Sequence, residues 1–183
     1  MKSPFDLSGR KAVVTGGSRG IGGAIAELFL EHGAEVAICH LGDEANASAL
    51  RERMAARGHA LHCTECDVSS PAAVDRFAEW ATQRLGQVDI VVNSAGVGGG
   101  DRPFESTDER DWDLTVGVNL RGTMLVTRAF FAGMTSRQWG RVINVASQLA
   151  YKGAPGLAHY CAAKAGVVLS LIHISEPTRQ AEI

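Results

Sequence analysis

The sequence predicts an α/β fold, in which helices cover both faces of a parallel β-sheet. Two observations predict it. Short apolar runs alternate along the chain with segments of helix length, and the first run leads directly into a turn rich in glycine. Parallel strands require helical crossovers and are buried on both faces, so their sequences read as continuous apolar runs. We therefore expect three layers, α/β/α, with a helix between successive strands.

Five short apolar runs are the predicted strands, at residues 12–14, 36–38, 60–63, 88–92 and 142–145. Two of the segments between them carry apolar residues at helical spacing: Ile21, Ile25 and Leu28 in the first, and Val74, Phe77, Ala81 and Leu85 in the second. Each set predicts an amphipathic helix whose apolar stripe lies on the sheet. Gly33 and Gly58 stand where helices are expected to end.

The segment 107–137 predicts one long helical region, because it contains no proline and carries apolar residues on several of its faces. We expect a bend near Gly117 or Asn119, and a helix that is buried widely or shared with a partner. The segment 96–103, just before it, is a loop rich in glycine. It follows the fourth strand, at the end of the sheet where open parallel sheets bind ligands.

Composition restricts the classes of function. The chain has 183 residues, of which 45% are hydrophobic and 21% charged, as in a single soluble globular domain. Its formal net charge of −2 and the absence of a dense lysine and arginine cluster argue against nucleic-acid binding. No apolar run approaches the roughly 20 residues of a membrane span, and the polar N-terminus lacks the core of a signal peptide. We expect a cytoplasmic protein that does not bind membranes.

The four cysteines are too few and too scattered for a disulfide framework: Cys39, Cys63, Cys66 and Cys161. Cys63 and Cys66 have the spacing of a zinc or redox pair, but no second pair follows. We interpret all four as reduced thiols that pack in the fold, and we expect no metal site.

The glycine-rich turn runs from Thr15 to Gly22, between the first predicted strand and the first predicted helix. In that position backbone amides and the positive end of the helix can hold the pyrophosphate of a dinucleotide. The turn lacks the Gly-Lys-Ser/Thr ending of a mononucleotide phosphate loop, which argues against a phosphotransferase. The alternative is a tight turn that needs glycine only for its backbone angles.

Ser147, Tyr160 and Lys164 lie at the end of the last predicted strand and in the helix that follows. Tyr160 and Lys164 are four residues apart, so they share one helical face. A phenol has a reference pKa of about 10, and lowering such a value to about 7 takes about 4 kcal/mol of phenolate stabilisation, part of which a nearby ammonium supplies. A serine can orient a substrate oxygen toward the tyrosine, so these three residues together can donate a proton to a substrate. The alternatives are a surface pair and a helix-capping serine.

Six motifs, in this order, resemble the short-chain dehydrogenase/reductase family, from about residue 7 to about residue 168. They are Thr15–Gly22, Asp67-Val68, Asn93-Ser94-Ala95-Gly96, Val118-Asn119-Leu120, Ser147, and Tyr160 with Lys164. The sequence departs from the family pattern at Ser94, which replaces a second asparagine, and in the histidine that precedes Tyr160. The resemblance implies a Rossmann-type fold. It is nearest to 3-oxoacyl carrier-protein reductases, with sugar and polyol dehydrogenases almost as close.

This resemblance implies hydride transfer between a nicotinamide cofactor and a carbonyl or secondary alcohol. The implied catalytic residues are Asn119, Ser147, Tyr160 and Lys164. Tyr160 is the acid/base, Lys164 stabilises the phenolate and anchors ribose, Ser147 orients the substrate, and Asn119 relays protons. The implied cofactor-binding residues are Gly16, Ser18, Arg19, Gly20, Ile21, Gly22, His40, Asp67, Val68, Asn93, Ala95, Gly96, Tyr160 and Lys164.

The second predicted strand favours NADP over NAD. It ends at Cys39-His40-Leu41 without the carboxylate that usually binds the ribose hydroxyls of NAD, although Asp43 and Glu44 follow shortly. Arg19 can meet a 2′-phosphate with a charge-assisted hydrogen bond. The alternative for Arg19 is a solvated loop charge.

Residues 170–183 do not continue the resemblance. They have mixed polarity, include Pro177, and resemble translated vector sequence more than any family member. We therefore expect a Rossmann-type domain at 1–169 that lacks the last two strands of the family fold, followed by a foreign tail. Such a chain is expected to fold poorly and to have little activity, whereas its full-length parent is expected to be an active homodimer or homotetramer. A dinucleotide-binding module that senses without turnover is the alternative.

Overall fold

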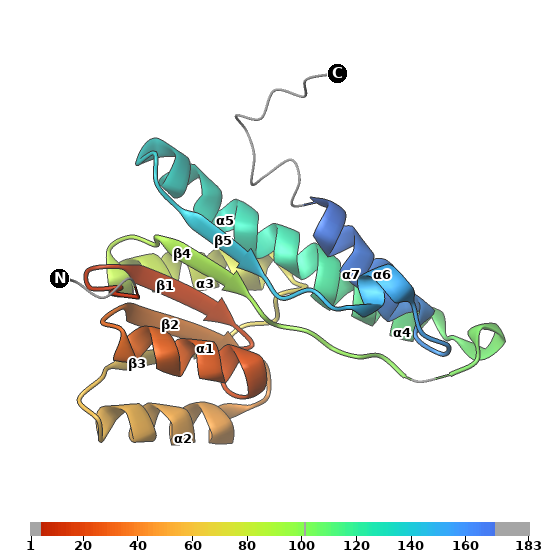
Figure 1. Ribbon diagram of the computed structural model, residues 1–183, viewed down its shortest axis with the longest axis horizontal. Helices are drawn as coiled ribbons and strands as arrows, with labels where there is room; N and C mark the ends of the chain where they lie inside the picture. The colour runs from red at the N-terminus through yellow and green to blue at the C-terminus, as the bar shows by residue number, and fades with distance from the viewer. Residues whose placement is uncertain (1–4, 101, 171–183) are drawn as a thin grey trace. The chain divides into compact units, whose positions relative to one another are not determined.

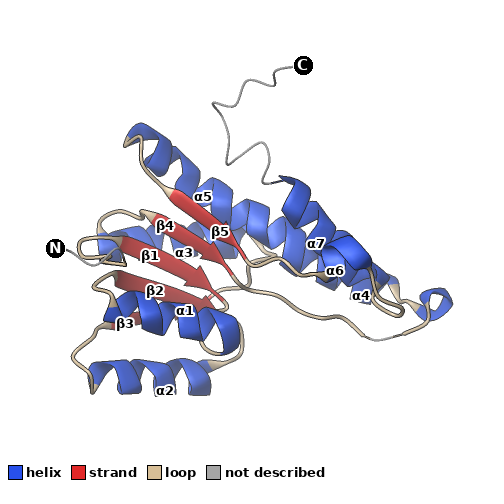
Figure 2. Ribbon diagram, in the orientation of Figure 1, coloured by secondary structure: helices blue, strands red, loops and turns tan. Residues whose placement is uncertain are grey.

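The computed structural model describes residues 5–100 and 102–170, which form two compact units. Among the described residues, the first comprises 5–95 and 122–145, and the second comprises 96–100, 102–121 and 146–170. Figures 1 and 2 show the helices and strands, which follow one another as β1 (Lys11–Thr15), α1 (Gly20–Glu31), β2 (Glu35–His40), α2 (Glu44–Ala55), β3 (Leu61–Glu65), α3 (Pro71–Leu85), β4 (Ile90–Asn93), η1 (Phe104–Ser106), α4 (Glu109–Val116), η2 (Gly117–Gly122), α5 (Thr123–Ser136), β5 (Arg141–Asn144), α6 (Leu149–Lys152) and α7 (Ala158–Ser170).

The first unit is built on a five-stranded parallel sheet with the order β3-β2-β1-β4-β5. Val13 at its centre pairs with Ala37 of β2 on one side and with Val91 of β4 on the other. All five predicted strands are confirmed. The third begins and ends slightly later than predicted, because its pairing with β2 continues as far as Glu65 opposite His40.

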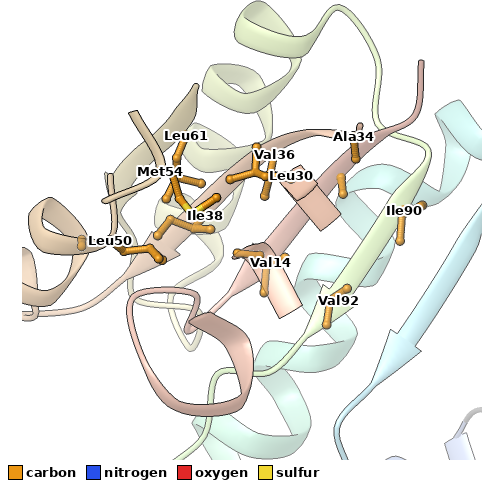
Figure 3. Packing of buried hydrophobic residues seen from close by; sticks show 13 residues of the cluster. Val14, Leu30, Ala34, Val36, Ile38, Leu50, Met54, Leu61, Ile90 and Val92 are labelled. Carbon is orange, nitrogen blue, oxygen red and sulfur yellow. The ribbon is translucent and has the colours of Figure 1, made fainter. Parts of the chain in front are cut away.

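Helices cover both faces of this sheet, which confirms the predicted three layers. On one face, α1 and α2 enclose a buried cluster with β1, β2, β3 and β4, in which Val14, Ile38 and Leu50 meet (Figure 3). On the other face, α3 contacts β2 and α5 contacts β4. There the ring of Phe77 packs edge-on against Phe130, with 6.1 Å between the ring centroids.

The two predicted apolar stripes have different outcomes. Val74, Phe77, Ala81 and Leu85 are the buried residues of α3, as predicted. In α1 the prediction is wrong for two of its three residues, because Ile21 is 63% exposed and Leu28 is 52% exposed. The third, Ile25, is partly buried and packs against the core cluster, as predicted. The buried residues of that helix are instead Gly22, Gly23, Ala26 and Leu30. The backbone of α1 approaches the preceding turn closely at its glycines, and this approach decides which face of α1 lies inward. The buried face of the helix therefore begins with small residues rather than large ones.

A pair of leucines in α1 tests this correction. We expect Leu30→Ala to lower the free energy of unfolding by about 2–5 kcal/mol, because Leu30 is only 2% exposed in the core cluster. Leu28→Ala is its matched control and is expected to change the free energy by less than about 0.5 kcal/mol, as a surface substitution does. Urea unfolding followed by circular dichroism measures both. Equal losses in the two variants would contradict the assigned face.

The predicted helical region 107–137 consists of α4, η2 and α5. Its middle part, Gly117–Gly122, is π-helical and includes both residues at which a bend was predicted. Isolated π-helical turns within α-helices are frequent at functional sites. The predicted helix ends at Gly33 and Gly58 are confirmed by their φ angles of +89° and +81°.

The second unit is helical. In it, α7 packs against both α4 and α6. The backbone N–H of Arg102 donates to the carbonyl oxygen of Gly156 at 3.3 Å, and the Arg102 guanidinium lies 3.1 Å from the Asp111 carboxylate. The hydrogen bond joins the loop before α4 to the loop before α7, and the ion pair joins the same loop to α4 itself. Within residues 5–100 and 102–170, no helix is long and apolar enough to cross a membrane.

The four cysteines are free thiols. A hydrogen bond between the side chains of Cys39 and Cys66 raises the pKa of Cys39 and lowers the pKa of Cys66. Cys66 therefore has its partner on the neighbouring strand rather than at Cys63. In the described parts of the chain, no three histidine, cysteine or acidic side chains gather in a group that could hold a metal ion.

Candidate active site

The glycine turn of the first unit packs tightly on the chain that leaves β4. Thr15 Oγ1 accepts hydrogen bonds from the backbone N–H groups of Ser94 and Ala95, both at 3.1 Å. A Cβ on Gly16 would lie 2.8 Å from the Ala95 α-carbon, and a Cβ on Gly22 would overlap the carbonyl oxygen of Gly16. Only glycine fits at these two positions, so the turn requires its glycines for close approach of backbone to backbone.

The N-terminus of α1 suits an anion such as a pyrophosphate. Arg19 occupies the N-cap position without a capping hydrogen bond from its side chain, and the first turn of the helix carries no acidic residue. Gly20 has a φ of +57° and open space where a side chain would stand. The positive end of the helix is therefore not neutralised by a side chain of its own, and a dinucleotide pyrophosphate fits there.

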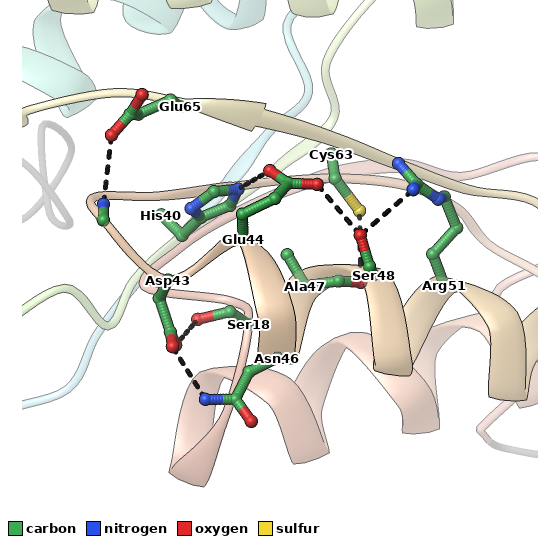
Figure 4. Close-up of polar contacts among 11 residues, drawn as sticks. Ser18, His40, Asp43, Glu44, Asn46, Ala47, Ser48, Arg51, Cys63 and Glu65 are labelled. Carbon is green, nitrogen blue, oxygen red and sulfur yellow. Dashed lines mark hydrogen bonds and ion pairs between the residues drawn. The ribbon is translucent and has the colours of Figure 1, made fainter.

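Asp43 lies beside this turn, which sequence reasoning did not anticipate. Its carboxylate accepts hydrogen bonds from Ser18 Oγ at 2.6 Å and from Asn46 Nδ2 at 2.7 Å (Figure 4). It also accepts one from Arg19 Nε at 3.0 Å. The hydrogen bonds from Ser18 and Asn46, followed by the charge of Arg19, lower the pKa of Asp43. Arg19 is thus ion-paired rather than only solvated. The position of Asp43 shortly after a strand was the one signal in the sequence.

Three further residues that were predicted to bind the cofactor have side chains that contact other parts of the protein. His40 is buried, and its Nε2 lies 3.3 Å from the Glu44 carboxylate (Figure 4). The carboxylate of Asp67 accepts from the backbone N–H and the hydroxyl of Ser69, at 2.9 and 2.7 Å. Val68 is buried and lies where a side chain on Gly122 would clash with it. Their roles toward a cofactor stay predictions.

Asn93 holds β4 to its neighbours. Its Nδ2 donates to Thr127 Oγ1 of α5 at 2.9 Å and to Asn144 Oδ1 of β5 at 2.8 Å, and the side chain is buried. These bonds fix the end of β4, from which the chain continues into Ser94 and Ala95. Asn93 therefore supports the turn through the backbone that follows it, and direct contact with a cofactor stays a prediction.

In the second unit, three predicted residues come together at Gly96. Asn119 lies in the π-helical η2, and its Nδ2 donates to the carbonyl oxygens of Val97 and Thr115 at 2.8 and 2.9 Å. A Cβ on Gly96 would lie 2.7 Å from Asn119 Oδ1 and 3.7 Å from Lys164 Nζ. The bare backbone of Gly96 is what allows an amide oxygen and an ammonium from different helices to converge.

Tyr160 and Lys164 both lie on α7, as their spacing predicts. Lys164 Nζ is 5.8 Å from the centroid of the Tyr160 ring, within the range in which a cation is attracted to an aromatic face. Lys164 is almost completely buried, and this burial lowers the pKa of its ammonium. A buried cation beside a phenol is suited to stabilising the phenolate.

Ser147 precedes α6, which packs on α7. Its Oγ accepts a hydrogen bond from the backbone N–H of Leu149 at 3.2 Å. The alternative interpretation of Ser147 as a helix-capping serine is therefore correct for this bond. That bond uses a lone pair of the hydroxyl and leaves its hydrogen for donation. A capping serine is therefore still able to donate to a substrate oxygen.

The sequence predicted no role for two buried polar side chains of this unit. His159 and Thr115 are fully buried, and within the described residues neither imidazole nitrogen of His159 nor Thr115 Oγ1 has a hydrogen-bond partner. Both lie beside Gly99, where an added side chain would meet them. The histidine before Tyr160 is thus an inward-facing residue between α7 and the glycine-rich loop.

Comparisons with known proteins agree on one family. The family model described as short chain dehydrogenase matches residues 10–183. A D-threitol dehydrogenase from Mycolicibacterium smegmatis is 40% identical over 90% of this chain and 62% of its own length. A 3-oxoacyl-(acyl-carrier-protein) reductase from Chlamydia muridarum is 35% identical over 88% of this chain and 65% of its own length. The chain thus spans less than two-thirds of the length of these curated relatives.

Solved structures give the same result. A metagenomic short-chain oxidoreductase, crystallised in complex with NADP, superposes with a TM-score of 0.90 at 34% identity, covering 96% of this chain and 79% of that one. A short-chain alcohol dehydrogenase, described as putative, from Sinorhizobium meliloti superposes with a TM-score of 0.86 at 33% identity, covering 96% of this chain and 71% of that one. The predicted family and the Rossmann-type fold are confirmed.

Proposed function

The chain belongs to the short-chain dehydrogenase family, and from that premise we propose that it interconverts a carbonyl group and a secondary alcohol by NADP-dependent hydride transfer. We further propose 3-oxoacyl compounds as its substrates. The similarity to a 3-oxoacyl-(acyl-carrier-protein) reductase and to an acetoacetyl-CoA reductase from Allochromatium vinosum supports this substrate class. The similarity to a D-threitol dehydrogenase makes polyols the alternative class.

The convergence of Asn119 and Lys164 at Gly96, with Tyr160 on the same helix as Lys164, is the observation that carries the proposal. A carbonyl that accepts a hydride becomes an alkoxide unless a proton arrives with it. A reductase therefore needs a phenol or an equivalent acid near the carbonyl, and a charge that stabilises the resulting anion. The second unit contains both groups on α7.

Each residue then has one role in the reaction. The reduced nicotinamide, when bound, supplies the hydride. Tyr160 donates its phenolic proton to the substrate oxygen, and the Lys164 ammonium stabilises the phenolate that remains. The Ser147 hydroxyl donates a hydrogen bond to the same oxygen and orients it. Asn119, held by its two backbone carbonyl partners, takes part in returning a proton to Tyr160.

The residues of the first unit bind the cofactor in this proposal. The N-terminus of α1 and the glycine turn hold the pyrophosphate. Gly20 leaves open space for it, while Gly16 and Gly22 allow the close backbone packing that shapes the turn. Two observations support NADP rather than NAD. No carboxylate ends β2, where His40 stands instead, and Arg19 at the turn can bind a 2′-phosphate. The solved relative in complex with NADP agrees with this preference.

The other predictions about the whole protein remain proposals. Met124 and Phe131 are exposed apolar side chains of α5, which supports a homodimer or homotetramer. The cytoplasmic location, the domain boundary at residue 169 and the foreign tail stay predictions of the sequence. Residues 171–183 lie outside the described residues.

Binding and turnover assays test the proposed function. The chain is mixed with NADPH and a 3-oxoacyl thioester, and in parallel with NADP⁺ and a linear polyol, while NADPH absorbance is followed. A second version, in which residues 170–183 are replaced by a family-like ending, is assayed beside it. For the second version we expect NADPH binding, and a kcat/KM for the thioester at least about tenfold above that for the polyol. The unaltered chain is expected to have little activity.

Each other result contradicts a different part of the proposal. A higher kcat/KM for the polyol contradicts the substrate class. Tight NADPH binding without turnover of either substrate, in both versions, supports the sensing module. The absence of NADPH binding in both versions contradicts the cofactor.

A further inference from the structure

Asp43 links two segments that are far apart in the sequence. It is the N-cap residue of α2, and it reaches the glycine turn at Ser18, 25 residues earlier. Its Oδ2 atom accepts from both Ser18 and Arg19, while Oδ1 accepts from Asn46 of its own helix. Figure 4 shows the bonds to Ser18 and Asn46. A carboxylate with three donors is held in place and ionised, in accord with its lowered pKa.

The neighbouring strand end explains why Asp43 can take this position. In dinucleotide-binding folds an acidic residue near the end of the second strand meets the adenosine ribose. Here that end holds His40, which is buried and whose Nε2 lies 3.3 Å from the Glu44 carboxylate. The loop that follows is held by the backbone N–H of Gly42, which donates to Glu65 at 3.1 Å. Asp43 therefore supplies the carboxylate that the strand end lacks.

The ion pair with Arg19 is the functionally important contact. Arg19 keeps 75% of its side chain exposed, whereas Asp43 keeps only 22% exposed. A guanidinium has five N–H donors, of which the Asp43 carboxylate takes the one on Nε. An incoming 2′-phosphate would meet Arg19 with an anion already beside it. The attraction of the guanidinium for that phosphate is offset by repulsion from the carboxylate.

We propose that Asp43 is a specificity-determining residue, because its carboxylate competes with the 2′-phosphate of NADP for Arg19 and so narrows the preference for NADP over NAD. This inference rests on the proposed function, since it assumes that the glycine turn binds a dinucleotide. The ribose 2′-hydroxyl of NAD is uncharged and can donate to a carboxylate, so it meets no such repulsion. A change at Asp43 should therefore affect the two cofactors differently.

The test measures binding of two adenosine fragments, 2′,5′-ADP and 5′-AMP, by isothermal titration calorimetry of the full chain. They differ only by the 2′-phosphate and lack the nicotinamide, so the readout does not depend on turnover. We expect Asp43→Asn to tighten 2′,5′-ADP binding about fivefold, since removing one partner of an exposed ion pair has an effect of this order. The affinity for 5′-AMP should change by less than about twofold.

Two other variants separate the competition from less specific effects. Glu27→Gln is the matched control, because it also removes a carboxylate paired with arginines, Arg53 in α2 and Arg57 just after it, and changes the net charge equally. It should leave the affinity ratio of the two fragments unchanged. Arg19→Gln should weaken 2′,5′-ADP binding, and in the double variant with Asp43→Asn the fivefold gain should disappear.

Three outcomes overturn the inference. An unchanged affinity ratio in Asp43→Asn, with both fragments still bound, refutes the competition but leaves dinucleotide binding intact. An equal shift of the ratio in Glu27→Gln assigns the effect to net charge alone. If the unsubstituted chain binds neither fragment, the proposed function fails together with the inference. Should Asp43→Asn not fold, Asp43→Ser keeps an oxygen for Ser18 and must show the same shift of the ratio.

Discussion

Tyr160→Phe is expected to lower the kcat of carbonyl reduction about a thousandfold, while the affinity for NADPH changes by less than about twofold. The substitution removes only the phenolic hydroxyl, so the ring beside Lys164 is retained and the proton donor is lost. General acid catalysis of this kind contributes roughly 10²- to 10⁴-fold to a rate. Steady-state kinetics with a 3-oxoacyl thioester, together with fluorescence titration of NADPH, measure the two quantities.

The chain contains its own control for this substitution. Tyr151 in α6 is the other of its two tyrosines and is 79% exposed. Tyr151→Phe should leave both kcat and the NADPH affinity unchanged. If Tyr160→Phe kept the full rate of reduction, the acid/base assignment would be wrong. If neither the substituted nor the unsubstituted chain turned over, while both bound NADPH, the sensing module would be the better description.

Gly22→Ala is expected to abolish dinucleotide binding and to lower the free energy of unfolding by about 2 kcal/mol or more. The added methyl group would overlap the carbonyl oxygen of Gly16, lie 2.9 Å from the Gly16 carbonyl carbon and lie 3.1 Å from Ser94 Oγ. Two of these atoms belong to the backbone of the turn, so the turn itself must move. Thermal unfolding and calorimetric titration with NADPH measure the two losses.

Gly23→Ala is the matched control, one residue further along α1. A Cβ there would have its nearest neighbour at 3.4 Å, an ordinary contact. Alanine is the better helix former by up to about 1 kcal/mol, so this variant should be slightly more stable and should bind NADPH normally. Similar behaviour of the two variants would show that the turn is not held by close backbone approach. The assignment of Gly22 to the pyrophosphate site would then fail.

Sequence reasoning succeeded wherever the information was local. The apolar runs at 12–14 and 36–38 became β1 and β2, and the helical spacing of Val74 and Phe77 became the buried face of α3. It failed for α1, where Ile21 and Leu28 have the right spacing but face the solvent. Periodicity identifies a helix and its two sides. Which side is buried depends on what the helix must approach, and in α1 that is the glycine turn.

In the candidate site, too, local features could be predicted from the sequence and contacts between distant residues could not. The sequence by itself determined the glycine turn, the helix that carries Tyr160 and Lys164, and the family to which those motifs belong. Only the tertiary structure decided that Asp43 bonds to Ser18 and that Asn119 meets Lys164 at Gly96. A turn or a helical face depends on interactions within a few residues, which the order of amino acids specifies directly. Contacts between residues 25 or more positions apart depend on how strands pair and helices pack, and these exist only once the chain has folded.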